Sequence, residues 1–255
     1  MIQCSSAPGP EGHDYVIRRN DMRKFVFIGF ITILASISAA IAGSASEPSR
    51  CKEQDGVCKD FEKLTQAGQF EKIVNRIDST KQYSEEARHS IGHAYLQLAA
   101  VESNTPEQEE AFCRKALEFG ATQAYMGLYF IHVQKEGDKA LEFLRQYIAT
   151  KPRDSVPYVI LGESELNRKN YQLADTYLRE SKKVAMANSA HVDWMLFQAN
   201  YLLGNYEYAS ERLETAMNSG KFDQDLKALA SDARFEGMFT RPEFRKFQEP
   251  KSAAH

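Results

Sequence analysis

Two stretches of the chain carry the same pattern of turn, small and large apolar residues, 35 positions apart. The segment Asn170–Ala174 aligns with Asn205–Ala209 without gaps, and Leu178 and Leu213 each follow the alanine by four positions. A repeat of this length is typical of stacked helical hairpins. One hairpin cannot bury its apolar face alone, so neighbouring hairpins must share a core. The repeat therefore predicts an all-α solenoid of antiparallel helix hairpins.

The small residues of the repeat have a packing explanation. Ala174 and Ala209 are expected where the two helices of a hairpin approach closely, with a leucine filling the groove beside each alanine. Gly162 allows the same close approach on the first helix of its pair. Gly204 and Asn205 tolerate left-handed backbone and supply the turn between two helices. The pattern thus predicts both the helices and the connections between them.

These positions resemble the tetratricopeptide repeat family. With Ala174 and Ala209 on that family's second-helix alanine, Tyr158, Leu161 and Gly162 fall on its first-helix aromatic, leucine and glycine. Earlier units match less completely and have Sel-like character; their matching residues are Gly127, Ala140, Leu144 and Pro152 in one unit and Gly92, Tyr95 and Ala111 in another. The resemblance covers residues 58–220 and implies a right-handed α-solenoid. The alternative is an irregular all-helical domain in which part of the repetition is coincidental.

The sequence departs from the family pattern at three positions. Lys169 stands in place of the glycine between helices, Ser181 in place of a late alanine, and Asp193 in place of a first-helix aromatic residue. These departures weaken the match but leave the spacing of the two last units intact.

The resemblance also implies a partner-binding groove lined by the first helix of each hairpin. Carried over position by position, the groove residues are His89, His93, Val159, Glu163, Asn167, His191, Trp194, Gln198 and Tyr201. A large aromatic ring beside polar amides suits a peptide or a partner helix, because Trp and Tyr contribute much of the binding energy at protein interfaces. The alternative for Trp194 is that it packs inside its hairpin and only stabilises it. Val, Glu and Trp replace the lysine and asparagine with which some family members grip a terminal carboxylate.

An uncharged apolar run, Phe25–Ala42, follows the basic residues Arg23 and Lys24 and precedes the repeats. A basic start, an apolar core and a small-x-small site at Ala40–Ala42 are typical of a secretory signal peptide. The alternative is an uncleaved signal anchor, because 18 apolar residues lie at the lower limit for crossing a bilayer. Both interpretations place the repeats outside the cytoplasm. The protein is expected to be periplasmic or secreted, or else anchored in the inner membrane and facing the periplasm.

The remaining segments follow from this layout. A signal peptide normally starts shortly before its apolar core, so we expect translation to start at Met22 and residues 1–21 to be an untranslated polar leader. After the signal at 22–42, we expect an extended segment at 43–57, repeats at 58–220, a helical cap at 221–248 and a disordered tail at 249–255. A solenoid needs a cap over its last apolar face. The expected plugs, whose alternative role is a partner-docking patch, are Phe235, Phe239, Phe244 and Phe247.

The cysteines favour one short disulfide. In an oxidising compartment, Cys51 and Cys58 are the preferred pair, because a bond between them would tie the extended segment to the first helix. Pairing with Cys113 is the alternative, and the residual cysteine is then expected to be a buried free thiol. No second Cys or His pair has the spacing of a zinc finger, so no metal site is predicted.

Motifs of catalysis are absent from the sequence. It contains no Gly-x-Ser-x-Gly, phosphate-binding loop, dinucleotide fingerprint or His-Glu-x-x-His, so we expect no enzyme activity and no cofactor. His89 and His93 lie four apart and share a helix face, a spacing that can hold a metal. An accessory metal- or ligand-binding protein of the cell envelope is therefore the alternative function. The chain has 32 basic and 35 acidic residues, a balance that argues against a nucleic-acid partner. We expect a protein or peptide partner, no membrane contact after signal cleavage, and leave the oligomeric state open.

Overall fold

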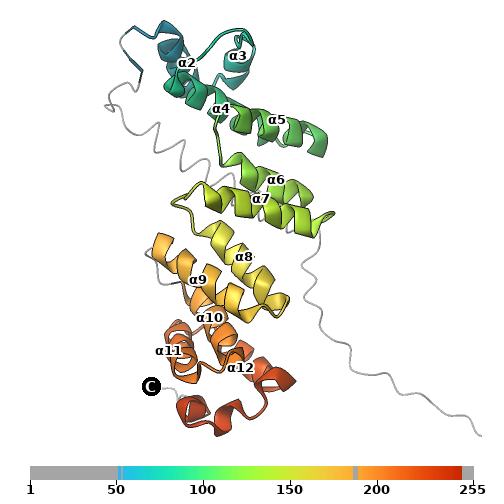
Figure 1. Ribbon diagram of the computed structural model, residues 1–255, viewed down its shortest axis with the longest axis vertical. Coiled ribbons are helices and arrows are strands. Elements are labelled where there is room, and N and C mark those ends of the chain that lie inside the picture. The colour runs from blue at the N-terminus through green and yellow to red at the C-terminus, as the bar shows by residue number, and fades with distance from the viewer. Residues whose placement is uncertain (1–50, 53, 186–188, 249–255) are drawn as a thin grey trace, which may run out of the picture. The chain divides into compact units, whose positions relative to one another are not determined.

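The computed structural model describes residues 51–52, 54–185 and 189–248, and within these residues every regular element is a helix (Figure 1). The chain divides into two compact units, Met1–Ser90 and Ile91–His255. The boundary falls inside the predicted repeat region 58–220. The predictions for the leader, the signal segment and the tail concern residues outside the described part of the chain.

The described part of the first unit consists of α2 (Gly56–Gln66), α3 (Phe70–Val74) and the start of α4 (Glu85–Ala99). Helix α2 starts at Gly56, within the segment 43–57 that was expected to be extended and before the predicted helix start at Asp60–Phe61. Its start is determined by Asp55, whose carboxylate accepts a hydrogen bond from the backbone N–H of Cys58 at 2.8 Å. An aspartate in this place satisfies one of the free N–H groups of the first turn. Asp55, which was expected to belong to the extended segment, is therefore the N-cap of α2.

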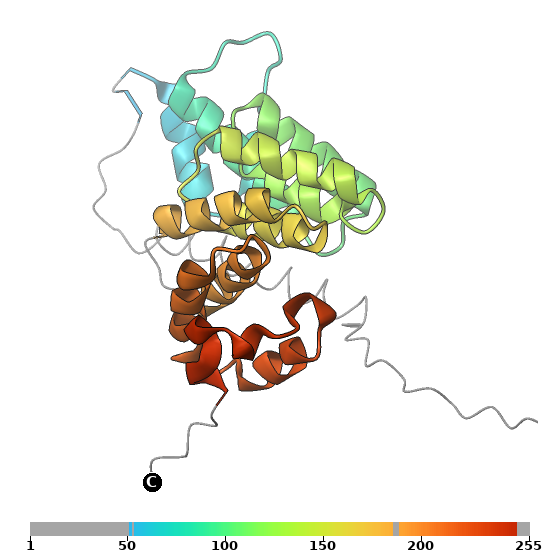
Figure 2. The ribbon, with the colours of Figure 1, turned by 60° about the horizontal axis from the view of Figure 1, so that its bottom comes forward.

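The second unit continues with seven helices joined by short connections: α5 (Pro106–Glu118), α6 (Ala124–His132), α7 (Gly137–Ala149), α8 (Val156–Asn167), α9 (Tyr171–Ala185), α10 (Ala190–Leu202) and α11 (Tyr206–Met217). The pairs α6–α7, α8–α9 and α10–α11 pack along their lengths, and α7–α8 and α9–α10 contacts join one pair to the next (Figures 1 and 2). The prediction of consecutive helix hairpins is confirmed. The right-handed superhelix stays a prediction.

The close approach predicted within a hairpin is found between α8 and α9. A Cβ atom added to Gly162 would lie 2.7 Å from the side chain of Leu178 and 3.5 Å from the carbonyl oxygen of Ala174. Ala174 and Ala209 are both fully buried, each on the second helix of its hairpin. The two alanines therefore occupy equivalent places, as the 35-residue repeat predicts.

Gly127 behaves differently from Gly162, although the resemblance places both on the same repeat position. A Cβ atom at Gly127 would lie 2.6 Å from Sγ of Cys113, which belongs to α5. This glycine therefore makes room for the preceding helix and not for α7, the second helix of its own hairpin. The unit needs one extra residue between its helices to match the family pattern, and its packing differs accordingly.

The chain ends in a compact cap made of α12 (Asp223–Ala230) and three short 3-10 helices, η1 (Ala233–Phe235), η2 (Met238–Thr240) and η3 (Pro242–Phe247). Phe235 and Phe244 are buried in one cluster with side chains of α10 and α11, and Phe239 and Phe247 pack against that cluster. The four phenylalanines thus serve as plugs over the last hairpin.

No helix within the described ranges is both long and apolar enough to cross a membrane.

Candidate binding surface

Helix α8 has one buried face and one open face. Leu161, Glu165 and Leu166 are buried, while Glu163 and Asn167 on the other side are exposed. The other face, which we call the α8 stripe, consists of Val156, Val159, Ile160, Glu163 and Asn167. Val156, Glu163 and Asn167 are exposed, whereas Val159 and Ile160 are half-buried and Val159 packs against the core cluster that contains Leu196. These residues recur every three or four positions, so they lie one above another on the helix. The stripe is aliphatic in its first two turns and polar in its last.

The polar end of the α8 stripe is open to a ligand. Within the described residues, the side chains of Glu163 and Asn167 form no hydrogen bond or ion pair. Glu163 lies near α6, since its charge adds to the effect of burial in raising the pKa of Tyr129. The carboxylate and the amide can therefore pair with groups of a partner without first giving up a contact.

Trp194, which corresponds to Val159 in the repeat, and Tyr201, which corresponds to the buried Leu166, are not open on α10. They are only 7% and 6% exposed and belong to the core cluster of the cap. The Trp194 ring stacks on Phe222 at 5.1 Å, and the Tyr201 ring stacks on Phe235 at 4.9 Å. The prediction that Trp194 and Tyr201 line a binding groove is therefore wrong, because aromatic side chains of the cap cover them. The alternative, in which Trp194 stabilises the fold, agrees with this packing.

The other predicted groove residues are spread over two helices. On α10, His191 is exposed and Gln198 is half-buried. On α4, His89 is exposed and His93 is half-buried, and the boundary between the two units runs between them. Among the described residues, no group of three or more His, Cys, Asp or Glu side chains could hold a metal ion. The structure thus adds no third ligand to the histidine pair.

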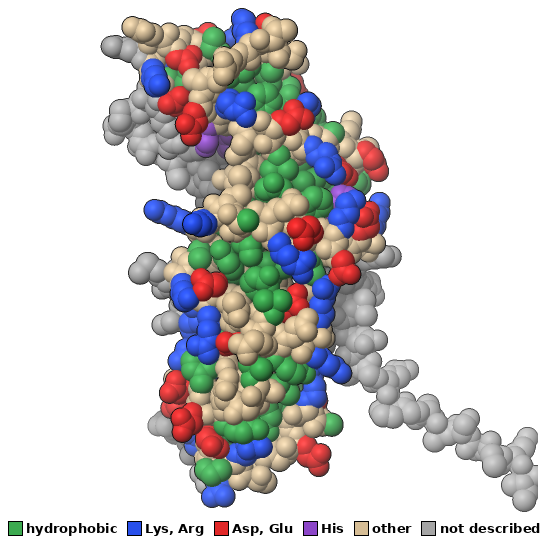
Figure 3. Space-filling model, viewed as in Figure 1, with side chains coloured by type: hydrophobic (Ala, Val, Ile, Leu, Met, Phe, Trp, Pro, Cys, Tyr) green, Lys and Arg blue, Asp and Glu red, His purple; other side chains and the backbone are tan. Residues whose placement is uncertain are grey.

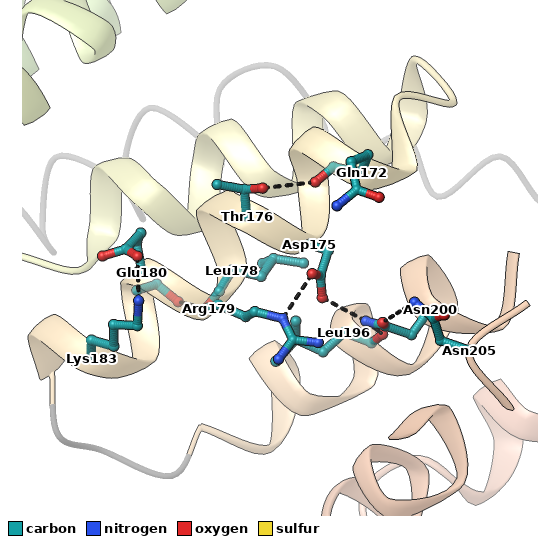
Figure 4. A network of polar contacts seen from close by, with 11 residues as sticks. Gln172, Asp175, Thr176, Leu178, Arg179, Glu180, Lys183, Leu196, Asn200 and Asn205 are labelled. Carbon is teal, nitrogen blue, oxygen red and sulfur yellow. Dashed lines mark hydrogen bonds and ion pairs between the residues drawn. The ribbon is translucent and has the colours of Figure 1, made fainter. Parts of the chain in front are cut away.

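Polar side chains, of which Asp175 and Asn200 are buried, join the last two hairpins (Figure 4). Nδ2 of Asn200 donates to Oδ1 of Asp175 at 2.6 Å and to the carbonyl oxygen of Leu196 at 2.9 Å. Nε of Arg179 donates to Oδ2 of Asp175 at 2.7 Å, and Nδ2 of Asn205 donates to Oδ1 of Asn200 at 3.2 Å. Because a buried polar group without a partner is costly, this set of bonds favours one alignment of α10 against α9.

A similar set of polar contacts lies one repeat earlier, between α7 and α8. Nδ2 of Asn170 donates to Oε2 of Glu165 at 2.8 Å, and a nitrogen of Arg145 lies 3.4 Å from Oε1 of the same carboxylate. Glu165 corresponds to Asn200 and Asn170 to Asn205 in the 35-residue alignment. The repeat alignment pairs Asn170 with Asn205, but it predicted only a turn there and not these hydrogen bonds. At the chain end, the hydroxyl of Ser210 on α11 donates to the carbonyl oxygen of Glu243 in η3 at 2.7 Å. A side-chain hydrogen bond thus also attaches the cap to the last hairpin.

Asp193, which departs from the family pattern, is explained by a charge cluster. Its carboxylate is fully buried, and Oδ1 accepts hydrogen bonds from Nζ of Lys182 at 2.6 Å and from Arg212 at 3.2 Å. The two cations come from α9 and α11. An ion pair across three helices thus replaces the aromatic contact of the repeat pattern.

The cysteine prediction is confirmed. Cys51 and Cys58 form a disulfide, and Cys113 is a free, buried thiol. Burial is the main reason why the pKa of Cys113 is raised to about 12. A thiol with so high a pKa carries almost no thiolate at neutral pH and is a poor nucleophile.

Charges of both signs are mixed on the face shown in Figure 3. Lysine and arginine side chains alternate there with aspartate and glutamate, and apolar side chains form separate patches between them. The described part of this face therefore presents no extended stretch of one sign.

These features define an all-helical protein built from consecutive hairpins, with a covered end and an open stripe on α8. No protein-family model matches the chain. No curated protein matches it either. Similar solved structures include three chains of MamA. "MamA AMB-1 C2221" is 15% identical with a TM-score of 0.41, over 64% of this chain and 95% of the MamA chain.

Two further MamA structures give comparable values. "MamA AMB-1 P212121" is 15% identical with a TM-score of 0.39, over 67% of this chain and 99% of its own. "MamA MSR-1 C2" is 14% identical with a TM-score of 0.38, over 67% and 96%. All three TM-scores are below 0.5, so this likeness carries no argument about the fold or the partners of the chain.

Proposed function

We propose that this protein is an exported scaffold of the cell envelope that binds a protein or peptide partner and has no catalytic activity of its own. The single observation that carries the proposal is the open α8 stripe, where Glu163 and Asn167 are exposed and have no partner among the described residues. Apolar side chains bordered by polar groups are typical of an interface with another chain.

Location in the envelope rests on two observations of different kinds. The apolar run Phe25–Ala42 has the composition of an export signal. The Cys51–Cys58 disulfide is typical of proteins in oxidising compartments. Both favour a periplasmic or secreted protein, or one anchored in the inner membrane and facing the periplasm.

The proposal is tested by crosslinking from defined positions in living cells. A photoreactive amino acid is introduced at Asn167 in the α8 stripe and, as a matched control, at Gln172, an exposed residue of α9 in the same hairpin. We expect one protein to be crosslinked from position 167 and not from position 172.

The crosslinked protein is then purified, and its affinity for wild-type protein and for the Glu163→Lys variant is measured. Reversal of an interface charge is expected to weaken binding by at least tenfold. Equal crosslinking from both positions, or equal affinity for both proteins, would contradict the assignment of the α8 stripe.

A further inference from the structure

The buried side chain of His132 lies between two carboxylates that come from different parts of the second unit. It is the last residue of α6 and is only 7% exposed. Its Nε2 lies 3.2 Å from Oε2 of Glu110 on α5, and its Nδ1 lies 3.6 Å from Oε1 of Glu136. Glu136 ends the turn 133–136, which joins α6 to α7. The imidazole also packs against the ring of Phe143 on α7, with 5.5 Å between the centroids. One side chain therefore connects α5 with the α6–α7 hairpin.

Both ring nitrogens face groups that can only accept hydrogen bonds. A neutral imidazole has one N–H group and one lone pair, whereas an imidazolium has two N–H groups. The neutral ring of His132 can thus donate to Glu110 or to Glu136, and it turns a lone pair toward the other carboxylate. Within the described residues, Nε2 is buried without a complete hydrogen bond. Only the charged ring satisfies both carboxylates.

Each carboxylate uses its second oxygen for a permanent cation. Arg114 donates from two nitrogens to Oε1 of Glu110, at 2.9 and 2.6 Å. Nζ of Lys139 lies 3.0 Å from Oε2 of Glu136. These two cations are the main reason why the pKa of Glu110 and the pKa of Glu136 are lowered. Both carboxylates therefore stay ionised between about pH 5 and pH 8, the range in which imidazoles change charge.

The other charged and titratable groups of these elements keep their state in the same range. Burial is the main reason why the pKa of the Cys113 thiol on α5 is raised to about 12, and the charge of Glu109 adds to this effect. Lys135, in the turn before α7, acts on Glu107 at the start of α5. Carboxylates and ammonium groups do not ordinarily titrate in this range. Among the described groups between α5 and the turn, His132 is therefore the one that responds to pH.

We propose that His132 is a pH switch: the protonated ring holds the turn 133–136 against α5 through Glu110 and Glu136, and the neutral ring releases Glu136. Glu136 has the longer contact and a side chain that is 47% exposed, against 27% for Glu110, so water replaces the ring more easily at Glu136. The inference does not depend on the scaffold function. Because α7 also packs against α8, the switch lies one helix away from the α8 stripe.

The direction of the effect follows from charge. Opening of the turn moves Glu136 away but leaves the ring between α5 and α7, so the cost of burying its charge is present in both forms. The attraction between Glu136 and the charged ring is present only in the closed form. Acid therefore favours the closed turn, and a rise in pH through the titration of the ring favours the open one.

The test uses the full chain and follows the turn by hydrogen exchange in NMR spectra. The backbone N–H groups of Lys135 and Glu136 donate to the carbonyl oxygen of His132, at 3.0 and 2.8 Å, so their protection measures closure of the turn. After correction for the intrinsic pH dependence of exchange, we expect protection to be about two- to fivefold higher near pH 5.5 than near pH 7.5, as for a partly exposed ion pair. The change should follow the titration of the His132 ring signals.

Variants attribute the effect to the ring. His132→Gln keeps a donor but carries no charge, so its protection should be the same at both pH values. The matched control His191→Gln, at an exposed histidine of α10, should keep the wild-type dependence. If His132→Gln does not fold, Glu136→Gln on the exposed side still decides, since it should also remove the dependence. Equal protection of the wild type at both pH values, higher protection at the higher pH, or an unchanged dependence in either variant of the switch would overturn the proposal.

Discussion

Lys169 and Gly204 occupy the same place in successive hairpins, and both have left-handed backbone, with φ of 65° and 82°. In each turn the next residue, Asn170 or Asn205, donates its backbone N–H to the carbonyl oxygen five residues before it, at 2.9 Å in both cases. This is the hydrogen bond of a Schellman motif, which requires a positive φ in the turn. The lysine thus follows the backbone of the glycine it replaces.

Lys169→Gly should therefore stabilise the protein. Left-handed backbone costs a residue with a side chain about 1–2 kcal/mol, and the greater freedom of glycine in the unfolded chain offsets part of that gain. We expect a net increase of about 0.5–1 kcal/mol in the free energy of unfolding, measured by urea denaturation. As a control, Lys139→Gly inside α7 should destabilise by about 1 kcal/mol. A loss of stability in Lys169→Gly would contradict the assignment of strain to this turn.

Gly162→Ala should destabilise the α8–α9 hairpin. The new methyl group would lie 2.7 Å from Leu178, and overpacking of this kind costs about 1–3 kcal/mol. Gly137→Ala is the matched control, because no atom lies within 4 Å of a Cβ atom there. Thermal unfolding should show a lower midpoint for the first variant and an equal or higher one for the second. Adding Leu178→Val should restore part of the loss; if it does not, the two side chains are not in conflict.

Asp193→Asn should strongly destabilise the last two hairpins. The change keeps the shape of the side chain but removes the charge that Lys182 and Arg212 share, whose side chains are only 20% and 23% exposed. Removing one partner of a buried ion pair costs about 3–5 kcal/mol, and the partial exposure of the two cations favours the lower end. Glu180→Gln, which breaks an exposed pair with Lys183, should cost at most about 1 kcal/mol. Chemical denaturation of both variants compares the two values directly; equal losses would show that burial of the carboxylate does not matter.

The fluorescence of Trp194 can be used to follow the packing of the cap, because Trp194 is the only tryptophan of the chain and lies in the cap cluster. Phe222→Ala removes the ring stacked on it, so we expect its fluorescence to shift to longer wavelength and acrylamide to quench it more strongly. Loss of an aromatic pair should also cost about 0.5–1.5 kcal/mol beyond the lost burial. Phe112→Ala on α5, far along the chain from the cap, should leave the emission unchanged. An unshifted spectrum in Phe222→Ala would mean that the cap does not shield the indole.

The start of α2 should become less stable in acid. A hydrogen bond from Ser84 and the N–H of Cys58 lower the pKa of Asp55, so its stabilising effect is complete above the unfolded value of about 4. It is lost as the pH falls through the lower folded pKa. Asp55→Ser keeps a neutral capping oxygen and should flatten this dependence. Hydrogen exchange of the Cys58 amide between pH 5 and pH 3 measures the difference; identical profiles would exclude Asp55 as the titrating group.

Local sequence signals determine the hairpins. The alanines at 174 and 209 and the turn residues that precede them depend on contacts within one hairpin, so their spacing alone predicts helix, turn and helix. The short disulfide follows in the same way from two cysteines seven positions apart. The hydrogen bond of Asn200 does not follow from local spacing, because its partner, Asp175, lies 25 positions away on the preceding helix.

The binding surface, in contrast, is decided by tertiary structure. Val159 and Trp194 hold the same repeat position, yet Val159 is only half-buried, whereas Trp194 is buried beneath the cap. Which of the two stays accessible depends on how residues 222–244 fold back over α10. Periodicity identifies the side of a helix that can face a groove, but only long-range packing decides whether another part of the chain already fills it.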